Sequence, residues 1–254
     1  MRARVNSSYM IHPLRHAYFI SLSYRKYVLA ARIFVDIKSE RPYNEINLFL
    51  KIAKGEDMEK DINYWGIGKF PVAVASRGRT CAFTGHRPKK MPWRYDESDP
   101  ACILLKETLA EQIKALADRG VEHFLSGGAD GVDLYAAEAV LALREQNPAI
   151  KLHCILPYRA QADQWPAASK QKYHAVLERA DVIAYVSQTY HKDCMLERNR
   201  FMADFAAVLL AVYNGERRGG TAATVRYAKR HGRELFIIDP VTCAVTHVDA
   251  SNLK

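Results

Sequence analysis

Long apolar runs and paired cysteines are both missing from this 254-residue sequence. It has no run of about 18 apolar residues, so we expect no transmembrane helix. The five cysteines are scattered and include no C-x-x-C pair, which argues against a zinc site or a disulfide framework. They lie mostly in apolar runs, as reduced core thiols do. We therefore expect a cytoplasmic protein without a bound metal ion.

Several nucleotide-binding and hydrolytic motifs are also absent. No G-x-x-x-x-G-K-[ST] occurs, which excludes a P-loop NTPase. Gly127-Gly128-x-x-Gly131 departs from G-x-G-x-x-G, so the usual dinucleotide fingerprint is missing too. Neither H-E-x-x-H nor G-x-S-x-G is present. The composition, 49% hydrophobic and 26% charged, is nevertheless that of an ordinary globular protein.

Acidic residues are too few to balance the basic ones, and the net charge is +9. Residues 1–78 contain 13 Lys and Arg against 7 Asp and Glu, whereas the remainder contains 24 against 21. The basic excess therefore lies mainly in the N-terminal third. It gives no argument that the later part of the chain binds nucleic acid.

Residues 1–78 show no regular hydrophobic periodicity. Charged residues such as Arg25 and Arg32 interrupt the apolar patches, which argues against a signal peptide, and Pro42 breaks up any membrane-surface helix. We expect a poorly ordered N-terminal extension. An internal translation start, for example at Met58, would remove most of it, and N-terminal sequencing of the native protein would reveal this.

From residue 79 onward, short apolar runs alternate with amphipathic helical segments, which is the pattern of βα units around a parallel sheet. Asp99 before Pro100 is a typical N-cap followed by a first helical residue. We predict one domain, residues 79–254, with a doubly wound, mostly parallel, Rossmann-like α/β sheet. Five helices separate its six expected strands, which are residues 80–84, 121–125, 150–156, 181–186, 206–213 and 234–238.

Residues 126–133 join the second expected strand to the next helix. Gly127 and Gly128 allow positive φ and close approach of a ligand to backbone amides at a helix N-terminus. A plain tight turn is the alternative explanation. Asp130 and Asp133 would repel a phosphate, so we expect them either to cap the helix or to accept ribose hydroxyls.

A second glycine corner, Gly219-Gly220-Thr221, follows the fifth expected strand. Arg217 and Arg218 flank it, so free amides, a hydroxyl and positive charge occur together. This combination makes the corner the stronger phosphate site. Solvated arginines in a plain loop are the alternative.

Two further polar pairs are expected at the same carboxyl edge of the sheet, where ligands of doubly wound sheets lie. Arg87 can grip a phosphate in bidentate fashion, and His86 either stacks against a ligand or is a structural histidine. Glu197 and Arg198 form an acid–base pair near this crevice, or a simple surface ion pair.

Four motifs occur in order along the chain, and they are Gly85-His86-Arg87-Pro88, residues 126–133, Arg198-Asn199-Arg200-Phe201-Met202 and Gly219-Gly220-Thr221. Taken together, they resemble those of the YpsA family (UPF0398), a branch of the SLOG superfamily of Rossmann-like proteins. The resemblance covers about residues 79–239 and leaves the first 78 residues unmatched. It implies a Rossmann-like fold and a nucleotide-related ligand, such as a nucleoside phosphate, an NAD derivative or ADP-ribose. It implies no established reaction and no firm cofactor.

The related LOG phosphoribohydrolases cleave the base from nucleoside monophosphates. They carry an arginine with Met four residues later, followed by P-G-G-x-G-T-x-x-E. Arg198 and Met202 are similar to the first part, and Gly220-Thr221 to the second. The glutamate position holds Thr224, although an oxocarbenium-like transition state needs a carboxylate. Asp130, Asp133 or Glu197 could substitute for it, although nothing in the sequence selects one, and an N-glycosidic hydrolase is the alternative function.

The related DprA proteins handle single-stranded DNA, and their S-G-x-A-x-G-[IV]-D turn is similar to residues 126–133. Binding a single strand requires a basic groove with stacking aromatic residues. Residues 79–254 have little excess charge and no regular basic–aromatic series. Single-stranded DNA binding is therefore the third hypothesis.

The leading prediction is a protein that binds or senses a nucleotide-related small molecule, with nucleic acid as a less favoured partner. The sequence is also compatible with a homo-oligomer. Gly219, Gly220, Thr221 and Arg87 are expected to hold phosphate, while Asp130 and Asp133 face ribose. The full expected ligand-binding set is Gly85, His86, Arg87, Ser126, Gly127, Gly128, Asp130, Gly131, Asp133, Arg198, Gly219, Gly220 and Thr221.

Overall fold

The computed structural model describes residues 77–253. The expectations for the N-terminal extension, including the internal start at Met58, concern residues that lie outside this described part, apart from the last two positions of the extension.

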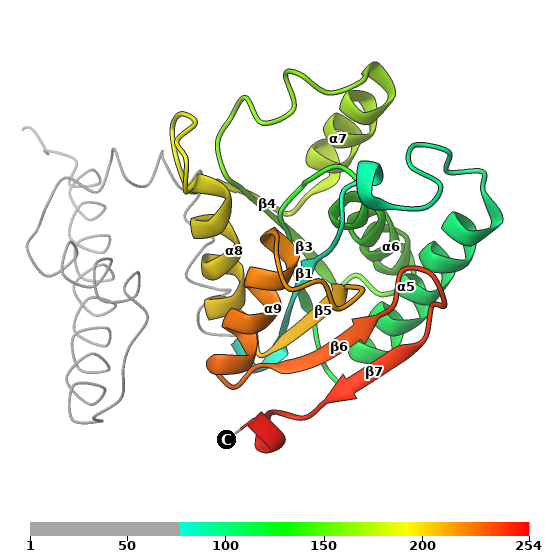
Figure 1. Cartoon of the computed structure of the whole chain (residues 1–254), viewed down its shortest axis with the longest axis vertical. Coiled ribbons are helices and arrows are strands. Elements are labelled where there is room, and N and C mark those ends of the chain that lie inside the picture. The colour runs from blue at the N-terminus through cyan, green and yellow to red at the C-terminus, as the bar shows by residue number, and fades with distance from the viewer. Residues whose placement is uncertain (1–76, 254) are drawn as a thin grey trace, which may run out of the picture. The chain divides into compact units, whose positions relative to one another are not determined.

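Seven strands form one sheet in the order β4-β3-β2-β1-β5-β6-β7, and the first six run parallel (Figure 1). This arrangement confirms the predicted doubly wound, mostly parallel α/β architecture. The strands are β1 (Thr80–Thr84), β2 (His123–Ser126), β3 (Lys151–Leu156), β4 (Val182–Tyr185), β5 (Val208–Val212), β6 (Glu234–Ile238) and β7 (Val245–Val248).

The edge strand β7 is an addition to the six predicted strands, and it pairs antiparallel with β6. Its side chains are exposed or only partly buried, so no alternating apolar face marks it in the sequence. A turn at Asp239 reverses the chain before it. The Asp239 carboxylate accepts hydrogen bonds from the amides of Val241 and Thr242, both at 2.9 Å.

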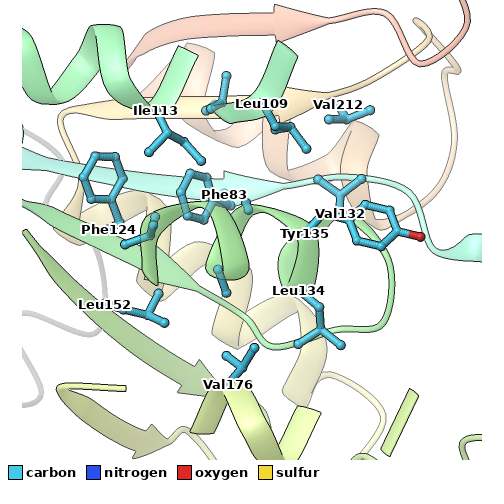
Figure 2. Close-up of a cluster of buried hydrophobic side chains, with 14 of the residues drawn as sticks. Phe83, Leu109, Ile113, Phe124, Val132, Leu134, Tyr135, Leu152, Val176 and Val212 are labelled. Carbon is cyan, nitrogen blue, oxygen red and sulfur yellow. The ribbon is translucent and has the colours of Figure 1, made fainter. Parts of the chain in front are cut away.

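Helices cover both faces of the sheet, as the continuous apolar strands require (Figure 1). Phe83 and Phe124 stack with their ring centroids 5.9 Å apart in the core beneath α5, α6 and α7 (Figure 2). Ala82 and Leu125 belong to the opposite core, which α8 and α9 close. The helices are α5 (Pro100–Asp118), α6 (Val132–Gln146), α7 (Ala167–Arg179), α8 (Cys194–Phe205) and α9 (Gly220–Arg230).

Helix α5 begins where the sequence predicts. The Asp99 carboxylate accepts a hydrogen bond of 2.8 Å from the Ala101 amide, and Pro100 occupies the first helical position. Gly120 follows the end of the helix with φ +94°, a conformation that glycine adopts readily.

All five cysteines are free, and four of them are buried, as expected of core thiols. Burial raises the pKa of Cys81 and raises that of Cys154 to about 12, so both remain protonated and unreactive. Within the part of the chain that the structure describes, no helix has the length and apolar character needed to cross a membrane.

The strand order reverses beside β1. From β1 the chain runs outward through β2, β3 and β4, then crosses to β5 on the other side of β1. In doubly wound sheets, ligands lie outside the carboxyl ends of the strands at such a switch point. The glycine turn after β2 and the glycine corner before α9 follow the two strands that flank β1, so both lie at this one edge.

Candidate functional site

The turn after β2 is packed too tightly for side chains at its glycines. A Cβ on Gly127 would lie 1.2 Å from Arg198 Nη1 and 2.6 Å from Asp133 Oδ2. Gly131 has φ +92°, and a Cβ there would lie 2.8 Å from the His86 carbonyl oxygen. Both positions therefore require glycine for steric reasons.

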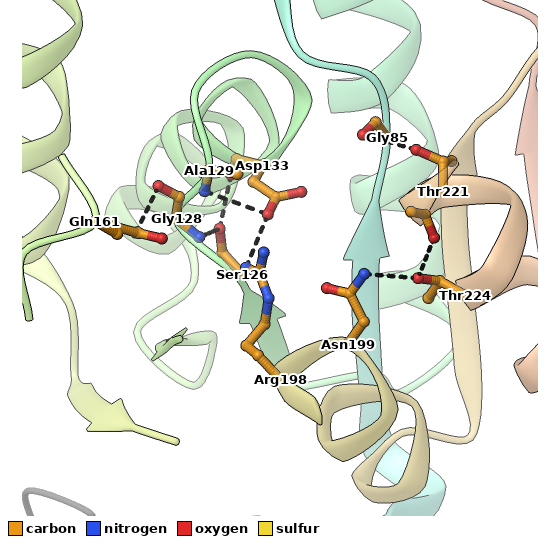
Figure 3. Close-up of polar contacts among 11 residues, drawn as sticks. Gly85, Ser126, Gly128, Ala129, Asp133, Gln161, Arg198, Asn199, Thr221 and Thr224 are labelled. Carbon is orange, nitrogen blue, oxygen red and sulfur yellow. Dashed lines mark hydrogen bonds and ion pairs between the residues drawn. The ribbon is translucent and has the colours of Figure 1, made fainter. Parts of the chain in front are cut away.

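A buried ion pair fills the space beside Gly127. Arg198 Nη1 lies 3.2 Å from Asp133 Oδ2, and the two residues are only 4% and 7% exposed (Figure 3). Burial raises the pKa of Asp133, against the opposing effect of Arg198. Burial likewise lowers the pKa of Arg198, against the opposing effect of Asp133. Each charge is thus held in the protein interior by the other.

Glu197 is not the partner of Arg198, in contrast to the expected acid–base pair. Its carboxylate lies 3.4 Å from His191 Nε2 instead. Adjacent residues of a helix point in different directions, so Glu197 and Arg198 do not share a face of α8. Sequence proximity was therefore a misleading guide to this contact.

Several other polar groups of the β2 turn are bonded to one another (Figure 3). The Ser126 hydroxyl accepts from the Gly128 amide at 3.1 Å and donates to the Asp133 carbonyl at 2.8 Å. The Asp133 carboxylate also accepts from the Ala129 amide at 3.3 Å. Gln161, which no motif indicated, donates to the Gly128 carbonyl at 3.1 Å. These amides are engaged within the protein rather than offered to an anion.

Asp130 differs from Asp133 in staying partly exposed. It does not cap α6, because the N-cap residue is Gly131 and no side chain caps that helix. The capping alternative for Asp130 is therefore wrong. Its carboxylate lines a cavity of about 550 Å³ that α6 and α7 border.

The corner before α9 is open to solvent, in contrast to the β2 turn. Arg217, Arg218, Gly219 and Gly220 are exposed, and Gly219 has φ +109°. No side chain caps α9. The first amides of a helix have no intrahelical acceptor and lie at its positive end, so this corner can hold an anion.

Hydrogen bonds tie this corner to β1 and α8 (Figure 3). The Thr221 hydroxyl donates to the Gly85 carbonyl at 3.0 Å. The Thr224 hydroxyl donates to the Gly220 carbonyl at 2.9 Å and accepts from the Asn199 side-chain amide at 2.8 Å. Segments far apart in the sequence therefore hold the α9 N-terminus in place.

Lys90 is a cation at this corner that sequence reasoning missed. Its Nζ would lie 3.8 Å from a Cβ built on Gly219, and it pairs with Glu216 Oε2 at 2.6 Å. That hydrogen bond lowers the pKa of Glu216. The signal was the basic pair Lys89-Lys90 directly after the motif at residues 85–88.

The structure places His86 and Arg87 in different surroundings. His86 is 5% exposed, and its Nε2 lies 3.2 Å from Asn214 Oδ1, which agrees with a structural histidine. Arg87 is exposed, with its guanidinium carbon 6.0 Å from the centroid of the Trp165 ring. Its charge is one of those that oppose the rise in the pKa of Asp133 caused by burial, so Arg87 acts on the β2-turn side of the edge.

The sheet order and the glycine-rich carboxyl edge define a Rossmann-like α/β protein. The family model YpsA, described as the YspA SLOG family, matches residues 81–243. The chain belongs to this family, which confirms the resemblance seen in the sequence.

Curated relatives agree with this assignment. A UPF0398 protein of Halalkalibacterium halodurans is 33% identical over 132 residues, covering 51% of this chain and 70% of the relative. UPF0398 protein YpsA of Bacillus subtilis is 31% identical over 143 residues, covering 56% and 79%.

Two solved structures show a distant likeness. DNA processing protein A (DprA) of Streptococcus pneumoniae is 18% identical, with 64% of this chain and 53% of that one covered and a TM-score of 0.44. DNA processing protein A of Helicobacter pylori, whose structure concerns a single-stranded DNA binding mode, is 18% identical, with 71% and 73% covered and a TM-score of 0.47. Likenesses this distant say nothing about what the present chain binds.

Proposed function

We propose that this protein binds or senses a nucleotide-related ligand at the carboxyl edge of its sheet and acts in the cytoplasm. The observation that carries the proposal is the exposed N-terminus of α9 at the switch point. There Gly219 has positive φ, the exposed Arg217 and Arg218 directly precede the uncapped amides, and Lys90, which is paired with Glu216, lies beside Gly219. These are the features that recognise a phosphate group.

Binding is preferred to N-glycosidic hydrolysis because residue 224 is a threonine rather than a glutamate. This residue stands where the hydrolases carry a glutamate, and its hydroxyl is engaged with Gly220 and Asn199. Asp133, another carboxylate at this edge, is paired with Arg198. Neither residue is free to stabilise an oxocarbenium ion or to activate water.

Single-stranded DNA binding is the second candidate, and one observation favours it. Aromatic rings that are scattered in the sequence gather near the carboxyl ends of β3 and β4. The rings of Tyr158 and Tyr190 contact edge to face, with their centroids 5.6 Å apart. The guanidinium carbon of Arg159 lies 4.8 Å from the centroid of the Tyr185 ring. Oligonucleotide affinity that falls steeply with salt would favour this class.

A ligand titration tests the leading proposal. AMP, NAD and ADP-ribose are added separately at millimolar concentration, and thermal unfolding is followed. A ligand present at 100 times its Kd should stabilise the fold by about 2.7 kcal/mol. The double variant Arg217→Ala/Arg218→Ala should weaken the affinity by about tenfold, because each arginine contributes a charge-assisted contact.

Lys229→Ala/Arg230→Ala is the matched control, since it removes the same charge from the exposed C-terminal end of the same helix. It should leave the affinity unchanged. If both double variants weakened the affinity equally, the effect would come from non-specific attraction between the ligand and the positive charge of the protein. No stabilisation by any of the three ligands would refute the proposal.

A further inference from the structure

A cavity of about 550 Å³ lies beside Asp130, on the face of the sheet that α6 and α7 cover. Its volume falls in the range of small-molecule sites, which are mostly apolar and contain a few placed polar groups. No expected site residue other than Asp130 lines it. The lining residues used below are Pro88, Tyr95, Asp130, Tyr135, Pro166 and Ser169.

Two polar groups in this cavity lack strong partners among the described residues. The Tyr135 hydroxyl, in a residue only 3% exposed, is buried without a hydrogen bond of ordinary geometry, and the Cys102 thiol beside it is a weak partner. For the Asp130 carboxylate, the described part of the chain likewise supplies neither a hydrogen bond nor an ion pair. Unpaired buried polar groups are rare in folded proteins, so the Tyr135 hydroxyl requires an explanation.

The other charges around the cavity neutralise one another. Lys172 Nζ donates to Glu97 Oε1 at 2.5 Å and lies 3.7 Å from Glu138 Oε2, while Lys106 Nζ donates to Glu97 Oε2 at 2.5 Å. Both ammonium groups lie over the Tyr135 ring: that of Lys106 is 4.8 Å from the ring centroid, and that of Lys172 is 5.2 Å from it. The Tyr135 hydroxyl and the Asp130 carboxylate are thus left as the groups that can receive a ligand.

These groups fit a neutral ligand that carries hydroxyls. A carboxylate accepts hydrogen bonds from ribose hydroxyls and repels phosphate. The faces of Pro88, Pro166 and the 47% exposed Tyr95 offer apolar surface to a flat ring. Ser169 adds a hydroxyl in the first turn of α7, which no side chain caps.

We infer that this cavity binds the ribonucleoside end of the ligand, with Asp130 accepting ribose hydroxyls and the Tyr135 hydroxyl completing a hydrogen bond with the same moiety. The inference rests on the proposed function, because it assigns one part of that ligand. The phosphate end is assigned to the α9 corner, beside the exposed Arg217 and Arg218.

Calorimetric titration of the full chain with adenosine, guanosine, cytidine and uridine tests this assignment. At least one should bind, and its 2′-deoxy analogue should bind about tenfold more weakly, as loss of one charge-assisted hydrogen bond implies. Asp130→Asn and Tyr135→Phe should each raise the Kd of the ribonucleoside to a similar extent.

The unfolding temperature of Tyr135→Phe shows whether a loss of affinity in this variant comes from a destabilised fold. Because the Cys102 thiol is only a weak partner for the hydroxyl in the free protein, this variant should unfold at the same temperature as the wild type or higher. The double variant Arg217→Ala/Arg218→Ala should leave the affinity for the ribonucleoside unchanged and should weaken the affinity for AMP.

Ribonucleoside binding that ignores both cavity substitutions overturns the inference, and so does the absence of binding by all four compounds. AMP binding that needs Arg217 and Arg218 but tolerates both cavity substitutions overturns the inference and leaves the proposed function standing. If AMP, NAD and ADP-ribose all fail to bind, the inference and the proposed function are both refuted.

Discussion

Replacing Arg198 with methionine should lower the free energy of unfolding by about 3–5 kcal/mol, because it leaves the buried Asp133 carboxylate without its counter-ion. Methionine keeps most of the side-chain length, so loss of charge rather than loss of volume dominates. Urea unfolding followed by circular dichroism measures the difference.

The pH dependence of this variant identifies the cause. Burial raises the pKa of Asp133 in the folded state, and removing Arg198 removes the effect that opposes it. The folded protein then binds a proton more tightly than the unfolded chain does. Its stability deficit should therefore shrink as the pH falls from 8 towards 5. A deficit that stays constant over this range would mean that packing, not charge, is responsible.

The double variant Arg198→Met/Asp133→Asn supplies the control. Asparagine keeps an acceptor for the Ala129 amide but carries no charge, so the double variant should be more stable than Arg198→Met alone. We expect a coupling energy of about 1–3 kcal/mol between the two positions. Strict additivity would contradict the ion-pair account.

Replacing Gly127 with alanine should be nearly as destabilising, by about 3–5 kcal/mol, because the added Cβ would occupy the position of the Arg198 guanidinium. The arginine cannot move aside without separating from Asp133. Gly78→Ala is the matched control, since nothing lies within 4 Å of a Cβ there and its φ is not positive. That variant should change stability by less than about 0.5 kcal/mol.

The two expected effects share one cause, so they should not add. In an Arg198→Ala background the guanidinium is gone, and only the Asp133 carboxylate, 2.6 Å from the added Cβ, must shift, so Gly127→Ala should cost less there than in the wild type. Chemical unfolding of the four proteins closes this cycle. A full second penalty would show that Gly127 is required for some reason other than the arginine.

The fold was predictable because its signals are local. Alternating apolar runs identified the six parallel strands, and the Asp99-Pro100 pair identified the start of α5. The edge strand β7 escaped prediction because one side of it has no neighbour and its side chains remain largely exposed. A strand without a buried face leaves little pattern in the sequence.

The site was predictable as a set of segments but not as a set of contacts. Glycines marked both turns, yet at Gly127 the closely approaching group is Arg198 of the protein itself, and a Cβ on Gly219 would meet nothing nearer than 3.8 Å. Lys90, rather than Arg87, lies beside Gly219. Such pairings depend on how α8 and the loop after β1 cross the carboxyl edge, and spacing within the sequence does not encode that crossing.

The cavity beside Asp130 depends still more on tertiary structure. Its walls come from the loop after β1, from the turn after β2, from α6 and from the N-terminal part of α7, and the sequence motifs supply only Pro88 and Asp130 of this lining. Tyr135 has the helical spacing of an ordinary core residue. Only its unpaired hydroxyl distinguishes it, and that property exists in the folded chain alone.

A crystal structure of the protein with ADP-ribose would show whether the carboxyl edge of the sheet holds the ligand. We expect a phosphate within hydrogen-bonding distance of the first amides of α9, beside Arg217, Arg218 and Lys90. A ligand bound at the amino ends of the strands, or a phosphate remote from Gly219 and Gly220, would contradict it.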